Sequence, residues 1–112
     1  MRLIAEFVRS SGKLTACTVK GHAPAAEDAE YSVLCAAVSS AMQLACNTLT
    51  ECFGVPEDAV SVNAAEGAQN QISVRRHNPD STQSGILQGL LIHFKLLAED
   101  SGGAFTVRVR ER

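Results

Sequence analysis

Residues 2–20 read RLIAEFVRS-SGK-LTACTVK, two stretches rich in β-branched and other apolar residues joined by a short polar segment. This composition predicts strands at residues 2–9 and 13–20. Ser10-Ser11-Gly12 between them has the chemistry of a hairpin turn, because glycine adopts a positive φ without steric cost. The first 20 residues therefore predict a β-hairpin.

Two later segments have a helical period. Residues 32–53 and 81–99 place apolar side chains every three or four positions, which predicts helices with one apolar side. The first series is Leu34, Val38, Met42, Ala45, Leu49 and Phe53, and the second is Ile86, Leu90, Phe94 and Leu97, widened by Leu87 and Leu91. Gly54 with Pro56 ends the first helix, and Asp100-Ser101-Gly102-Gly103 ends the second.

Three further strands are predicted at residues 60–64, 71–76 and 105–110. The last of these is the clearest, because Phe105, Val107 and Val109 alternate with polar residues. The order strand-strand-helix-strand-strand-helix-strand predicts an α+β fold. We expect a mostly antiparallel sheet with the two helices packed on one face, in a single domain over residues 1–112.

Composition excludes several functional classes. The chain has a net charge of −2, no Trp, one Tyr and four Phe, so we expect no direct nucleic-acid binding. We also expect no membrane partner, since the sequence shows no apolar run near the ~20 residues of a membrane span. Glu6 comes too early for a signal peptide. The expected compartment is the cytoplasm, where cysteines remain thiols.

Residues 20–40, KGHAPAAEDAEYSVLCAAVSS, contain the chemically informative side chains. His22 follows a predicted strand at a glycine turn, and Cys35 lies in the first turn of a predicted helix for which Ser32 is a plausible N-cap. The partial positive charge at a helix start stabilises a thiolate, and a nearby histidine could take the thiol proton. The same residue types also fit a small buried cysteine and a surface histidine.

The other candidate residues favour structural roles. Cys17 and Cys52 are expected to be core cysteines, and Cys46 lies eleven residues after Cys35 along the predicted helix, too far for a disulfide. None of the four cysteines has the close spacing of a zinc site. No metal or other cofactor is therefore expected. His77 is predicted to lie in a solvated turn, and His93 to be a packed or interfacial histidine at the edge of the second helix's apolar side.

The sequence motifs around His22 and Cys35 are specific when they occur together. Gly21-His22-Ala23, followed by Val33-Leu34-Cys35-Ala36-Ala37-Val38-Ser39, resembles the signature of the bacterial ribosomal-processing cysteine proteases, and the resemblance covers the whole chain. It implies a cysteine endopeptidase with Cys35 as nucleophile and His22 as catalytic histidine. It also implies a homodimer whose substrate is the N-terminal extension of a large-subunit ribosomal protein, removed during ribosome maturation.

One position departs from that pattern. Family members usually carry Gly-x-Asp where this chain has Glu30-Tyr31-Ser32. A serine hydroxyl, as cap or orienting group, thus replaces a carboxylate three residues before the nucleophile. Glu27, Asp28 or Glu30 could supply the missing carboxylate. The departure favours an alternative hypothesis, a non-enzymatic dimeric ribosome-associated binding module with an impaired catalytic pair.

Overall fold

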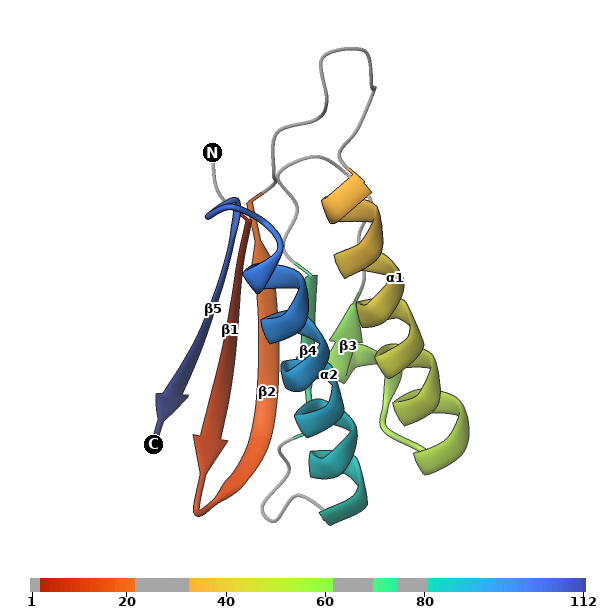
Figure 1. The fold of residues 1–112 in the computed structure, drawn as a ribbon. Helices are drawn as coiled ribbons and strands as arrows, with labels where there is room; N and C mark the ends of the chain where they lie inside the picture. The colour runs from red at the N-terminus through yellow and green to blue at the C-terminus, as the bar shows by residue number, and fades with distance from the viewer. Residues whose placement is uncertain (1–2, 22–32, 62–69, 75–80) are drawn as a thin grey trace.

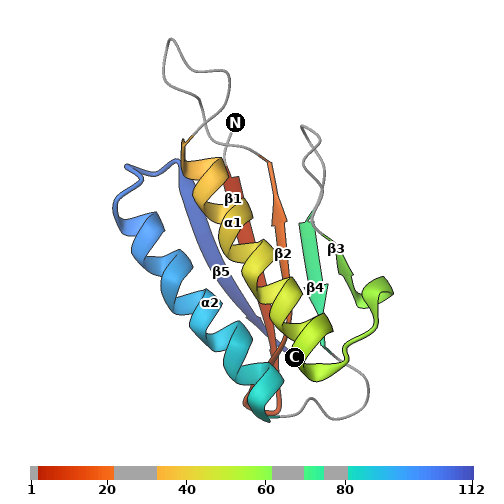
Figure 2. The same ribbon diagram turned by 90° about the vertical axis from the view of Figure 1, so that its right-hand side faces the viewer.

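The computed structural model describes residues 3–21, 33–61, 70–74 and 81–112. The strands are β1 (Leu3–Ser10), β2 (Lys13–Lys20), β3 (Val60–Ser61), β4 (Asn70–Ser73) and β5 (Phe105–Glu111). The helices are α1 (Val33–Asn47), α2 (Ser81–Glu99), a π-helical turn over Thr48–Cys52 and a short 3-10 turn over Glu57–Ala59. Figures 1 and 2 show α1 and α2 side by side on one face of the sheet, which confirms the α+β prediction.

The sheet has five strands in the order β3-β4-β2-β1-β5. β1 pairs with β2, β2 with β4 and β3 with β4, all antiparallel. β5 pairs with β1 in parallel. The prediction of a mostly antiparallel sheet is therefore confirmed, with a parallel edge strand. Parallel neighbours need a crossover connection, and α2 carries the chain across the helical face from β4 to β5 (Figure 1).

The first hairpin contains an irregularity that buries two consecutive residues of β2. Its turn has positive φ at Ser11 and Gly12, and the register with β1 shifts between Val8 and Arg9. Thr15 is the extra residue of this bulge, and its Oγ1 donates a hydrogen bond to the Val8 carbonyl at 3.3 Å. Leu14 and Thr15 are both buried as a result.

The core lies between the helices and the inner face of the sheet. Alternate residues of β1, Leu3, Ala5 and Phe7, are at most 4% exposed. Phe94 of α2 makes edge-on contacts with Phe7 and Phe105, with ring centroids 6.0 and 5.4 Å apart. These three rings hold α2 against β1 and β5.

The expectation that no apolar run is long enough to cross a membrane was wrong. By length and composition alone, the 20-residue segment Val33–Cys52 qualifies, with a mean hydropathy of 1.3. On its inner side Val38, Met42, Ala45 and Leu49 pack into the core. A helix that covers a sheet carries such an apolar side, and core packing accounts for this part of its hydropathy.

The end of the first predicted helix also differs from the sequence expectation. Phe53 is 41% exposed and Cys52 is exposed, although both were predicted to be in the core. The helical repeat holds as far as Leu49, which is fully buried. From Thr48 the turn is π-helical, and its wider spacing shifts the following side chains out of phase with the core. Of the predicted strands 60–64 and 71–76, residues 62–64, 75 and 76 lie outside the described part of the chain.

Candidate active site

Cys35 is the third residue of α1. Its side chain is half-buried and packs against the edge of the core cluster. The start of α1 lies at the same end of the molecule as the end of β2 and the start of β5 (Figures 1 and 2). The prediction that Cys35 lies in the first turn of a helix is therefore confirmed.

The other predicted site residues lie outside the described residues: His22, Ser32 and the candidate carboxylates Glu27, Asp28 and Glu30. The described chain stops at Gly21, whose φ is 81°, directly after β2. It resumes at Val33, at the same end of the molecule (Figure 1). The end of β2, shortly before His22 in the sequence, and the start of α1 therefore lie at one end of the molecule. The pairing of His22 with Cys35 stays a prediction.

Two of the remaining thiols are unsuited to nucleophilic chemistry. Cys17 is fully buried and its Sγ donates to Met42 Sδ at 3.9 Å. Burial, and secondly the neighbouring Cys46, raise the pKa of the Cys17 thiol far above its usual value. Burial raises the pKa of Cys46 to about 11. Both thiols are therefore neutral at physiological pH, as expected of core cysteines.

The structure also tests the roles predicted for Cys52 and His93. Cys52 is an exposed thiol, and His93 is exposed on α2 and does not pack in the core. His77 lies outside the described residues. Within the part of the chain that the structure describes, no three His, Cys, Asp or Glu side chains form a group that could hold a metal ion. Sequence reasoning also missed the outer face of α2, whose signal is two glycines and two large apolar residues at helical spacing.

Comparison with known proteins decides the family. Residues 3–105 match the model of a family described as cysteine protease Prp. The chain belongs to this family. The match covers both halves of the motif, Gly21-His22-Ala23 and the segment around Cys35, so the resemblance found in the sequence is confirmed. The prediction of a cysteine protease is confirmed with it.

Solved structures show the same fold. SMU.848 from Streptococcus mutans superposes with a TM-score of 0.79 at 22% identity, over 99% of this chain and 96% of that one. The essential ribosomal processing protease Prp from S. aureus, in complex with a covalently linked product peptide, gives 0.77 at 19% identity, over 96% and 99%. The same protease with a substrate peptide gives 0.71 at 19% identity, over 98% and 99%. No curated protein matches the chain.

Proposed function

We propose that this protein is a cysteine endopeptidase that removes an N-terminal extension from a large-subunit ribosomal protein during ribosome maturation. The observation that carries the proposal is Cys35 in the first turn of α1 in a member of the cysteine protease Prp family. The S. aureus relative, named a ribosomal processing protease and solved with peptides, supports this choice of substrate. We further propose that the protein works in the cytoplasm as a homodimer.

The first half of the reaction would form an acyl-enzyme. His22 takes the Cys35 proton, and the thiolate sulfur adds to the scissile carbonyl carbon. The carbonyl oxygen becomes an oxyanion, for which backbone N–H groups at the start of α1 are the proposed donors. When the intermediate collapses, the C–N bond breaks and the leaving amine takes the proton from His22.

The second half would release the other product. A water molecule gives a proton to His22 and its oxygen adds to the thioester carbonyl. Collapse of this intermediate breaks the C–S bond, the thiolate leaves, and the proton returns from His22 to Cys35. The products are the extension with a new carboxyl end and the shortened ribosomal protein with a new amino end.

Incubation with a peptide that spans the N-terminal region of the source organism's own large-subunit ribosomal protein tests this proposal. Mass spectrometry is expected to show cleavage at one bond by the wild-type protein and none by Cys35→Ser. Single Cys17→Ala, Cys46→Ala and Cys52→Ala variants are the matched controls and are expected to keep their activity. Full cleavage by Cys35→Ser would exclude the mechanism.

The alternative, a non-enzymatic binding module, gives a different result in the same assay. In that case the wild-type protein and Cys35→Ser would bind the peptide equally and neither would cleave it. Membership in a cysteine protease family favours the peptidase. If the ribosomal protein starts directly at its mature sequence, the proposed substrate is wrong even where the chemistry is right.

A further inference from the structure

The outer face of α2 carries an unusual row of residues. Gly85, Gly89, Ile92 and Leu96 follow one another at three- and four-residue spacing along this 19-residue helix, and we call them the α2 stripe. Both glycines are exposed, and Ile92 and Leu96 are 53% and 56% exposed. The stripe points away from the sheet, on the side opposite the buried Phe94.

Nothing in the described part of the single chain requires glycine at these two positions. A Cβ atom added at Gly85 or Gly89 would meet nothing within 4 Å, and neither residue has the positive φ that favours glycine. Alanine would fit both positions and would make a more stable helix. Glycine is useful on such a face when the backbone of another element comes close to it.

The order of residues in the stripe makes it complementary to itself. Along the chain it reads small, small, large, large. A second copy of α2 can lie antiparallel to the first, with the two-fold axis passing midway between the levels of Leu90 and Leu91 along the helix. In this arrangement Ile92 comes level with Gly89 of the second copy. Leu96 then comes level with Gly85 of the second copy. Each large side chain meets the space above a glycine, which is the arrangement an isologous two-fold interface requires.

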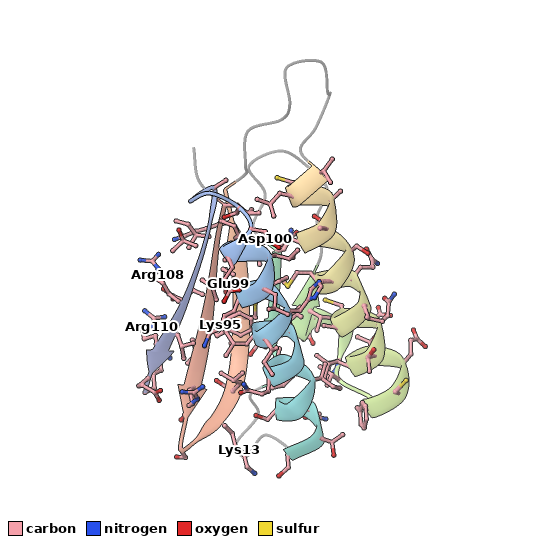
Figure 3. The ribbon with its side chains drawn as sticks, viewed as in Figure 1. Lys13, Lys95, Glu99, Asp100, Arg108 and Arg110 are labelled. Atoms are coloured by element: carbon pink, nitrogen blue, oxygen red, sulfur yellow. The ribbon has the colours of Figure 1, made fainter. Side chains whose placement is uncertain are left out.

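The charges at the ends of α2 favour the same orientation. Glu99 and Asp100 lie at its C-terminal end (Figure 3), and its last turn contains no basic residue. Carboxylates at a helix C-terminus are repelled by the helix's own dipole. The first turn has no acidic residue, so an antiparallel second copy brings a positive helix start against these carboxylates. A parallel copy would bring the acidic ends together.

We propose that the α2 stripe is the surface on which a second copy of this chain docks, antiparallel and in the register that places Ile92 over Gly89 and Leu96 over Gly85. The inference rests on the homodimer of the proposed function and adds its face and its register. The large residues supply the apolar contact, and the glycines allow the two helix axes to approach closely.

Ile92→Glu tests the face. Because it buries an unpaired charge twice in a symmetric dimer, it is expected to raise the dimer dissociation constant by roughly 100-fold, measured by analytical ultracentrifugation. The position is exposed in the single chain, so the circular dichroism spectrum is expected to stay unchanged. Leu44→Glu on α1, where Leu44 is 69% exposed, is the matched control and is expected to remain dimeric.

A mixing experiment tests the register. Gly89→Arg fills the space that Ile92 of the second copy would occupy, so it is expected to be monomeric by itself. When the Gly89→Arg variant is mixed with the Ile92→Glu variant, each heterodimer forms one new Arg–Glu pair and keeps one native Ile92–Gly89 contact. Native mass spectrometry is expected to show more heterodimer with this mixture than with Ile92→Glu and Gly85→Arg.

Three results would overturn the inference. They are a wild-type protein that is monomeric at about 50 μM, an Ile92→Glu variant as dimeric as wild type, and a loss of dimer in Leu44→Glu alone. The second and third results leave the homodimer standing and move it to another face. Failure to cleave the ribosomal peptide would contradict the proposed function and leave the association measurements intact.

Discussion

At the residue scale, four identical thiol groups acquire different chemistry from depth and position. Cys17 of β2 and Cys46 of α1 are buried in the core, where burial keeps both thiols protonated by raising their pKa. Cys52 is exposed on the π-helical turn. Cys35 combines partial exposure with a helix start, the two conditions that a nucleophilic thiol needs.

The dependence of Cys35 on His22 can be measured by alkylation. In a Cys52→Ser background, iodoacetamide is expected to modify Cys35 at neutral pH faster than it modifies an ordinary free cysteine. His22→Ala removes the proton acceptor, so its rate profile is expected to move to higher pH. His93→Ala, on the exposed side of α2, is the control and should leave the profile unchanged. Coincident profiles for wild type and His22→Ala would show that His22 is not the base.

The buried thiol Cys46 predicts a loss of stability at alkaline pH. Its pKa rises from 9.0 to about 11 on folding, so between these values the unfolded chain releases a proton that the folded chain keeps. The contribution of Cys46 to the free energy of unfolding is therefore fully present below pH 9 and is lost as the pH rises towards 11. From this group the free energy of unfolding falls by at most about 1.4 kcal/mol per pH unit.

Urea unfolding under reducing conditions at several pH values across this range measures that slope. Cys46→Ala is expected to show a shallower fall than wild type, because the titrating group is gone. Cys52→Ala, which alters an exposed thiol, is the control and is expected to keep the wild-type slope. Equal slopes for wild type and Cys46→Ala would contradict the burial of this thiol.

At the element scale, α2 is held by packing on one side and weakened by composition on the other. Phe94 lies between Phe7 and Phe105, and Leu87 and Leu91 are at most 1% exposed. The opposite side carries the two glycines of the α2 stripe, which lower the intrinsic stability of a helix. Tertiary contacts with β1 and β5 therefore compensate for a sequence that favours the helix only moderately.

Gly85→Ala and Gly89→Ala are expected to stabilise the single chain. In the Ile92→Glu background, which removes association, each is expected to raise the free energy of unfolding by about 0.5–1 kcal/mol. Chemical denaturation measures the change. Gly103→Ala is the contrasting control, because Gly103 has a φ of 92° and alanine there is expected to destabilise. A loss of stability in the α2 variants would mean that the monomer itself needs these glycines.

At the scale of the whole molecule, the two ends of the chain form one edge of the sheet. Leu3 pairs with Phe105 and continues in parallel register to Arg9 and Glu111. Arg9 Nη1 lies 2.9 Å from Glu111 Oε1, and Arg110 Nη2 lies 3.1 Å from Glu6 Oε1. Arg108 and Arg110 point away from the helices (Figure 3), so this part of β5 is solvated while Phe105 is buried.

Removal of residues 105–112 is expected to prevent folding. The deletion takes Phe105 out of the core and leaves β1 without its parallel neighbour. Circular dichroism and urea titration are expected to show no cooperative transition. The control is Arg110→Ala, which breaks an exposed ion pair and should cost at most about 1 kcal/mol. A cooperative transition in the truncated chain would show that β5 is dispensable.

Local patterns by themselves determined the hairpin, the two helices, the alternation of β5 and the place of Cys35 at a helix start. Each depends on neighbours within a few positions, where period, turn chemistry and capping act. Only the tertiary structure decided that β5 lies parallel to β1, that Cys52 and Phe53 face solvent, and that the α2 stripe is left uncovered. These features depend on contacts between distant segments and on the phase of a π-helical turn, and no local window of sequence contains that information.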